Sequence, residues 1–119
     1  MKKLFVLAFI GLLSVSIQAQ NKNATASFEV DGVCMMCKMR IEKAAITTKG
    51  VKSAAWNMES HMLNIMYNDE KTDIETVQKN LAEVGHDTEK FKASEKAYAS
   101  VDECCKYRDP DVVNAHQKN

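Results

Sequence analysis

Apolar residues recur along this 119-residue chain at two different spacings, one typical of strands and one typical of helices. The order of these segments constrains the fold more than any other feature. The two-residue period of half-buried strands marks residues 27–31, 51–58, 63–67 and 86–93, of which the last alternates most weakly. Apolar residues at three- and four-residue spacing mark helices at residues 37–49 and 72–84. This order predicts an α+β fold, a ferredoxin-like βαββαβ sandwich, with both helices on one face of the sheet.

Turn and cap residues agree with these segments. Gly50 and Gly85 follow the two predicted helices, and glycine commonly stands just after a helix end. Thr72 and Glu75 form a predicted capping box at the start of the second helix. The short polar stretch 59–61 separates the second and third strands and predicts a hairpin.

Residues 1–19 have the layout of a secretory signal peptide. Lys2 and Lys3 precede an apolar run that ends at Leu13, which is shorter than the ~18 or more residues of a membrane span. We therefore expect cleavage after Ala19 and secretion across the inner membrane. The expected product is a periplasmic protein without stable membrane insertion.

The rest of the chain is predicted to consist of a flexible leader at residues 20–26, a domain at residues 27–93 and a C-terminal extension at residues 94–119. The extension carries the adjacent pair Cys104-Cys105, and we expect it to dock on the domain. The whole chain has 16 basic and 16 acidic residues, and the signal peptide holds two of the lysines and no acid. The remainder is therefore slightly acidic, which gives no basis for nucleic acid as a partner.

Cys34 and Cys37 are the main candidate metal ligands. They lie where a loop becomes a helix, so the free amides and the dipole of the helix N-terminus favour thiolates. Lys38 and Arg40 are expected to add positive charge beside them. Two soft thiolates at this spacing can hold one thiophilic ion, and a two-sulfur site suits Cu(I) or Hg(II). The two methionines between the cysteines are expected to form an apolar collar around the site.

A redox dithiol and a structural disulfide remain alternatives for this cysteine pair. Thioredoxin-like enzymes place a cis-proline beside their dithiol, whereas the one proline of this chain is Pro110. The sequence contains neither a Ser/His/Asp set nor a glycine-rich phosphate loop. It therefore indicates no enzyme and no catalytic residue.

Several segments between Phe28 and about Phe91 follow the pattern of one known family. They are Val30-Asp-Gly-Val-Cys-Met-Met-Cys37, Arg40-Ile-Glu-Lys-Ala44, Gly50-Val51, Tyr67-Asn68 and Val84-Gly-His-Asp87. In these residues the chain resembles the heavy-metal-associated domain family, which includes copper chaperones, domains of copper-transporting ATPases and the periplasmic mercury-binding protein. The resemblance implies a βαββαβ fold and metal binding through Cys34 and Cys37.

Two departures from the family pattern bear on the site. The family usually has Gly-Met-Thr-Cys or Gly-Met-His-Cys in the metal loop, whereas Gly32-Val33-Cys34 is one residue shorter and lacks that methionine. His86 stands where the family often has Tyr or Phe beside the loop. His86 is therefore a candidate third ligand, or a hydrogen-bond donor that supports the site.

Cys104 and Cys105 lie outside the segments that resemble the family. They can form a vicinal disulfide, pair with Cys34 or Cys37, or add soft ligands to the metal site. The Cys-Cys-x-Tyr spacing resembles the tail of some small exported proteins of the family. If the tail adds thiolates, Zn(II) or a multinuclear Cu(I) cluster becomes an alternative to a single Cu(I).

We therefore expect an exported protein that binds a soft heavy-metal ion, foremost Cu(I), through Cys34 and Cys37 and transfers or buffers it. Hg(II) and Zn(II) are alternative ions, and His86, Cys104 and Cys105 are candidate additional ligands. A periplasmic scavenger of mercury or of heavy metals in general, and a thiol–disulfide oxidoreductase, are the alternative functions. The resemblance implies a metal-transporting ATPase or another metal-accepting protein as the partner.

Overall fold

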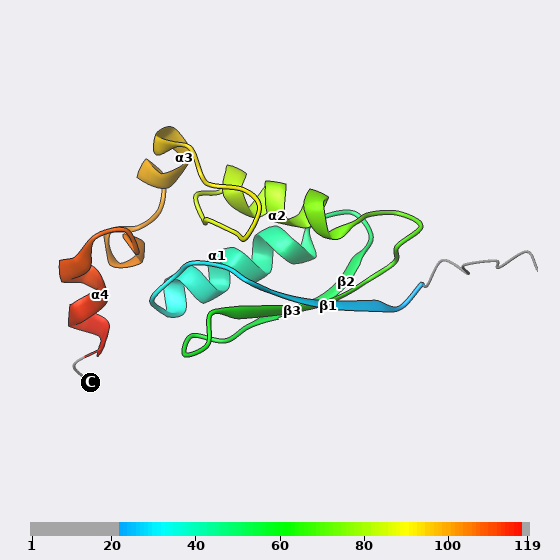
Figure 1. Ribbon diagram of the computed structural model, residues 1–119, viewed down its shortest axis with the longest axis horizontal. Helices are drawn as coiled ribbons and strands as arrows, with labels where there is room; N and C mark the ends of the chain where they lie inside the picture. The colour runs from blue at the N-terminus through cyan, green and yellow to red at the C-terminus, as the bar shows by residue number, and fades with distance from the viewer. Residues whose placement is uncertain (1–21, 118–119) are drawn as a thin grey trace, which may run out of the picture.

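The computed structural model describes residues 22–117, and their elements follow the predicted order as far as the second helix (Figure 1). The strands are β1 (Ala24–Glu29), β2 (Val51–Trp56) and β3 (Met62–Tyr67). The helices are α1 (Met35–Ile46), α2 (Ile74–Glu83), α3 (Glu95–Ala99) and α4 (Pro110–Gln117), with a 3-10 turn η1 (Glu103–Cys105). The predicted signal peptide lies outside the described residues. Within residues 22–117 no helix is both long and apolar enough to cross a bilayer.

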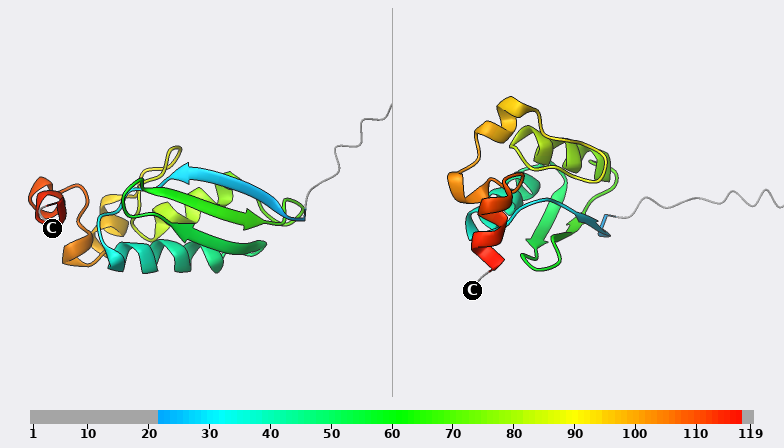
Figure 2. Two further views of the ribbon diagram at one scale, coloured as in Figure 1. Left: turned by 90° about the horizontal axis from the view of Figure 1, so that it is seen from below. Right: turned by 60° about the vertical axis from the view of Figure 1, so that its left-hand side comes forward.

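The antiparallel sheet of the described chain has the order β1-β3-β2, and α1 and α2 cover one of its faces (Figures 1 and 2). On the covered face, Phe28 of β1 and Trp56 of β2 both stand opposite Leu63 of the central strand. All three side chains are buried, as are Ile65 and Tyr67 of β3. The alternation of each strand therefore places its apolar side chains under the helices, and the predicted α+β class is confirmed.

Residues 86–93 do not form the predicted fourth strand. Their pairing with the sheet, in the part of the chain that is described, is one isolated bridge between Val30 and Thr88. The segment bonds to itself instead, because the Ala93 N–H donates to Asp87 Oδ1 at 2.7 Å and Thr88 closes a turn with its own hydroxyl. Asp and Thr side chains compete with sheet hydrogen bonds in this way. The result is a compact loop beside α2 (yellow in Figure 1).

Two element starts differ from the sequence prediction. β1 begins at Ala24, inside the predicted flexible leader 20–26, because it pairs with β3 along its whole length. The cap of α2 is Asp73, whose Oδ1 accepts the Thr76 N–H at 2.7 Å, and not the predicted Thr72. An aspartate at this position satisfies one of the free amides of the helix start equally well.

The described part of the extension, residues 94–117, is called the tail below. It curls around the end of the molecule at which α1 begins, as both views of Figure 2 show. Helices α3 and α4 contain no buried residue, and the two buried residues of the tail, Val101 and Cys105, lie between them. This arrangement places η1, and with it Cys105, against the domain.

Truncation of Leu81 tests whether α2 packs as described. Leu81 is fully buried on α2, so Leu81→Ala should lower the free energy of unfolding by about 2–5 kcal/mol through lost burial and a cavity. Lys79→Ala, an exposed change on the same helix, should alter it by about 0.5 kcal/mol or less. Urea unfolding followed by circular dichroism measures both. Equal stability of the two variants would contradict this packing.

Candidate metal centre

The loop before α1 is held close to the core at Gly32. A Cβ atom at this position would lie 3.0 Å from the Trp56 ring and 3.0 Å from Cys37 Cβ. The Trp56 indole N–H donates to the Val30 carbonyl oxygen at 3.0 Å and so fixes the end of β1 beside the loop. Val33, which replaces the methionine of the family pattern, is partly buried against the core. Gly32 therefore allows the short loop to pass close to both Cys37 and the buried indole.

Cys34 is the N-cap residue of α1 and Cys37 lies in its first turn. Their Sγ atoms are 3.5 Å apart, Cys37 is fully buried, and Cys34 is 9% exposed. The first turn of α1 contains no acidic residue that would oppose a thiolate. The predicted placement of the pair at a helix N-terminus is what the structure has.

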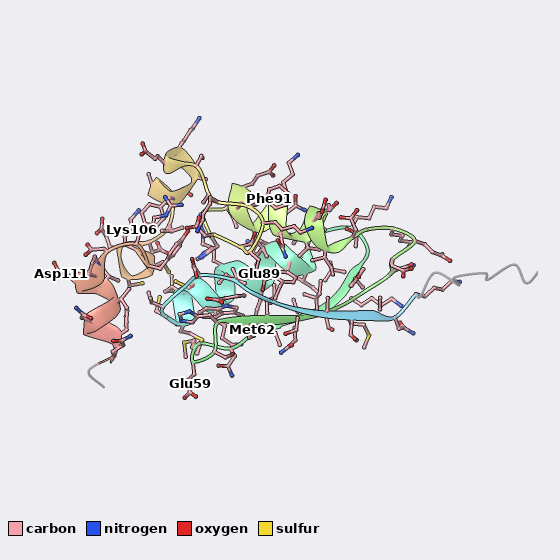
Figure 3. The ribbon with its side chains drawn as sticks, viewed as in Figure 1. Glu59, Met62, Glu89, Phe91, Lys106 and Asp111 are labelled. Atoms are coloured by element: carbon pink, nitrogen blue, oxygen red, sulfur yellow. The ribbon has the colours of Figure 1, made fainter. Side chains whose placement is uncertain are left out.

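The tail brings two further sulfurs to the same place. Cys105 Sγ lies 3.3 Å and Cys104 Sγ lies 3.5 Å from Cys34 Sγ, across about 70 residues of sequence. The three sulfur atoms lie within 4.8 Å of one another, and all four cysteines are free thiols. Figure 3 shows the tail, with Lys106 and Asp111 labelled, at the end of the molecule where α1 starts. Cys34 is thus in contact with every other cysteine of the chain.

Burial and hydrogen bonding together lower the pKa of one of the four thiols and raise the pKa of the other three. Burial raises the pKa of Cys34, but the backbone N–H of Cys37 and the neighbouring thiols outweigh it and lower that pKa below its ordinary value. Burial raises the pKa of Cys37, and burial with the nearby sulfurs of Cys37 and Cys34 raises the pKa of Cys105. Contact with Cys34 raises the pKa of Cys104. Cys34 is therefore the most acidic thiol of the cluster and the first to become a thiolate.

The cations expected beside the sulfurs are engaged elsewhere. Lys38 Nζ lies 2.6 Å from a Glu42 carboxylate oxygen, and Arg40 Nε donates to the Val84 carbonyl oxygen at 2.9 Å. The expected contribution of these cations stays a prediction. The groups that lower the pKa of Cys34 are the backbone N–H of Cys37 and the neighbouring thiols.

His86 lies in the core between the metal loop and the tail. Its Nδ1 donates to the Asp31 carbonyl oxygen at 2.8 Å, and its ring stacks on the Tyr107 ring with 5.6 Å between centroids. Burial lowers the pKa of His86, so the ring is neutral, and its buried Nε2 has no hydrogen-bond partner among residues 22–117. The group of sulfurs within 4.8 Å of one another does not include His86. His86 therefore supports the loop through a hydrogen bond, and its role as a third ligand stays a prediction.

Met35 and Met36 do not form the expected apolar collar. Their side chains are 54% and 47% exposed, on the outer side of the first turn of α1. The sulfurs are covered by the tail instead, because η1 packs against α1 at the cluster. The cover over the site thus comes from a segment more than 60 residues away, the extension that was expected to dock on the domain.

Comparison with known proteins agrees with this geometry. The profile of the heavy-metal-associated domain matches residues 27–87, half of the chain, including both cysteines of the metal loop. The protein belongs to the heavy-metal-associated domain family. It therefore carries a heavy-metal-binding domain, and the tail lies outside the matched residues.

Copper-handling proteins are among the relatives of this heavy-metal-associated domain. The copper-exporting P-type ATPase of Staphylococcus saprophyticus subsp. saprophyticus is 34% identical over 77 residues, which are 63% of this chain and 10% of that ATPase. The structure of a CopZ metallochaperone matches with a TM-score of 0.53 at 27% identity, over 55% of this chain and 98% of that one. The N-terminal soluble domains of Bacillus subtilis CopA match with a TM-score of 0.52 at 25% identity, over 57% and 46%. The chain thus spans about a tenth of the curated relative.

Metal binding by these thiols should depend on pH with a definite sign. Cys37, Cys104 and Cys105 have raised pKa values and hold protons at neutral pH, and a coordinating thiolate holds none. Metal binding therefore releases protons, and the apparent affinity should fall as pH falls, by about tenfold per unit for each proton released. Competition titrations between about pH 6 and 8 measure this slope. A constant affinity over this range would contradict the assignment of thiols.

Proposed function

We propose that this protein binds Cu(I) through Cys34 and Cys37 and carries or buffers it outside the cytoplasm. The observation that carries the proposal is the pair of buried sulfurs 3.5 Å apart at the N-terminus of α1. The backbone N–H of Cys37 and the neighbouring thiols lower the pKa of Cys34, which favours its thiolate form. Soft thiolates prefer Cu(I) and other thiophilic ions over hard cations, which bind oxygen ligands.

The relatives support copper as the cargo. A copper-exporting ATPase and a CopZ metallochaperone are similar to this chain at 34% and 27% identity. The metal ion is the cargo of the protein, because the domain passes it on in the same oxidation state. We infer that the acceptor is a metal-transporting ATPase or another protein that presents thiolates or thioethers.

Transfer would proceed by ligand exchange at the two cysteines. An incoming thiolate of the acceptor bonds to the ion, and one cysteine of this protein then leaves it, so the ion is never free and its oxidation state is unchanged. Cys34 is the more exposed of the pair and carries the lower pKa, whereas Cys37 is fully buried. We infer that exchange begins on the side of Cys34.

Removal of the sulfur pair tests the proposal. The reduced protein should bind Cu(I) in competition with a coloured chelator under anaerobic conditions, and Cys34→Ser/Cys37→Ser should weaken binding at least about 100-fold, since outer-shell changes alone can cost that much. Met36→Leu is the control, because Met36 lies between the cysteines and is exposed. Unchanged binding in the double variant would contradict the proposal.

Parallel titrations separate the alternatives. Tighter retention of Hg(II) than of Cu(I), without transfer of Cu(I) to an acceptor domain, would replace the carrier by a scavenger of mercury or general heavy metals. Insulin reduction that disappears in Cys37→Ser would instead identify a thiol–disulfide oxidoreductase. Either result would contradict the proposal that the protein carries Cu(I).

Export is the second part of the proposal and has its own test. Lys2, Lys3 and the apolar run up to Leu13 support a cleaved signal peptide. Expressed in a bacterium with an outer membrane, the protein should appear in the periplasmic fraction with the mass of a chain that begins at Gln20. Lys2→Glu/Lys3→Glu should leave more uncleaved precursor inside the cell. A cytoplasmic protein of full mass would contradict export.

A further inference from the structure

The tail is a separate addition to the metal-binding domain. The family match ends at residue 87, and the tail, residues 94–117, follows it. Among the tail residues, Val101 and Cys105 are buried, and Cys105 contacts Cys34 of the metal loop. One of the two deepest contacts of the tail is therefore a sulfur contact with the metal site.

The tail is fixed to the domain mainly by two consecutive side chains, Tyr107 and Arg108, which we call the clamp. The Tyr107 hydroxyl donates to the Gly85 carbonyl oxygen at 2.5 Å and accepts the Asp87 N–H at 2.9 Å. Arg108 pairs with the Asp87 carboxylate, 2.7 Å from Oδ1, and donates to the Ala93 carbonyl oxygen at 2.8 Å. Asp87 and Ala93 lie in the loop that replaces the predicted fourth strand, and Gly85 lies directly before it.

Gly85 adds a close fit to the clamp. It has a φ of 106°, and a Cβ atom there would lie 2.5 Å from a Val101 methyl group and 2.7 Å from the Ala97 carbonyl oxygen. The end of α2 thus receives the tail directly. Clamp and close fit together hold η1 over the metal loop.

The sulfur spacing around Cys34 is close to that of thiolates that share one ion. Sulfurs bound to one tetrahedral ion at about 2.3 Å lie about 3.8 Å apart. Cys34 Sγ lies 3.5, 3.5 and 3.3 Å from the sulfurs of Cys37, Cys104 and Cys105. Cys34, Cys104 and Cys105 lie within 4.8 Å of one another and Cys37 lies outside that group, so its sulfur has to move closer when all four bind one ion. The thiol protons are then released to solvent and no electron is transferred.

We propose that Cys104 and Cys105 bind the same ion as Cys34 and Cys37, so that the tail converts the two-sulfur site of the domain into a closed four-thiolate site. The inference rests on the proposed function, because it needs the domain pair as ligands. A four-thiolate site would also fit ions that prefer tetrahedral sulfur coordination, such as Cd(II) and Zn(II). It would also let the tail control release of the ion. A closed tetrahedral site has no open position for an incoming ligand, so the ion leaves when the tail undocks.

We expect the tail to undock without unfolding of the domain. α3 and α4 have no buried residue, and the tail contributes Val101 and Cys105 to a buried core whose other members, such as Ile41, Leu63 and Leu81, belong to the domain. Segments with few buried contacts open at lower free energy than the core unfolds. The tail can therefore leave while the loop with Cys34 and Cys37 stays in place.

Counting sulfur ligands tests the four-thiolate site. The reduced full chain is loaded with one equivalent of Cd(II), and X-ray absorption should find four sulfur neighbours in the unaltered protein. Cys104→Ser/Cys105→Ser should show two sulfurs, whereas Asp111→Asn, an exposed change in α4, should keep four. Two sulfurs in every variant would overturn the inference and leave the Cu(I) proposal standing. Loss of metal from all of them would instead defeat the proposed function.

Weakening the clamp tests the control on release. Arg108→Ala and Tyr107→Phe lie outside the sulfur cluster, so they should lower Cd(II) affinity by about 10- to 100-fold, as changes to supporting residues do, and speed release to a chelator. In the Cys104→Ser/Cys105→Ser background the same changes should have no effect on either quantity. Circular dichroism and urea unfolding verify that each variant is folded. Equal effects in both backgrounds, or no effect in either, would contradict the inference that the docked tail controls release of the ion.

Discussion

The contact of one sulfur, Cys34 Sγ, with three others is the constraint on which the rest of the site depends. The four sulfurs are crowded, since Cys34 Sγ lies 3.3–3.5 Å from each of the other three. The backbone N–H of Cys37, in the first turn of α1, helps to lower the pKa of Cys34 and so favours its thiolate form. The short loop at Gly32 then sets its distance from the core, and the tail has to approach closely enough to complete the group.

The loop that follows α2 connects this sulfur group to the tail. Asp87 uses its carbonyl oxygen to accept the Asp31 N–H at 2.9 Å, its amide to reach Tyr107, and its carboxylate to pair with Arg108. The guanidinium lowers the pKa of Asp87 against the opposing effect of burial, so the pair stays charged at neutral pH. A regular strand would have committed these backbone groups to the sheet. The loss of the fourth strand is therefore what lets one segment hold the metal loop and the tail together.

Elements that depend on local pattern were predictable, and contacts between distant side chains were not. The alternation of Leu63, Ile65 and Tyr67 identified the buried face of β3, and the step from loop to helix located Cys34 and Cys37 at an N-terminus. In residues 86–93 the alternation of apolar residues is weak, and hydrogen bonds from side chains formed in place of the predicted strand. The partners of Lys38 and Arg40 likewise come from distant or same-face neighbours that charge alone does not reveal. The Cys-Cys-x-Tyr spacing did mark the segment that docks at the metal loop, since Cys105 contacts Cys34 and the Tyr107 hydroxyl donates to the Gly85 carbonyl oxygen.

The positions of Cys34 and Cys37 are set by the domain alone, and this explains how the tail can alter the site without rebuilding it. The close approach of Gly32 to Trp56 and the first turn of α1, which position the loop with the two cysteines, are contacts within the domain. The tail changes the number of ligands from two to four while the geometry of the first pair is kept. A two-sulfur site favours exchange with an acceptor, and a closed site favours retention. A chain with both can retain its ion with the tail docked and offer it through a preformed pair when the tail is released.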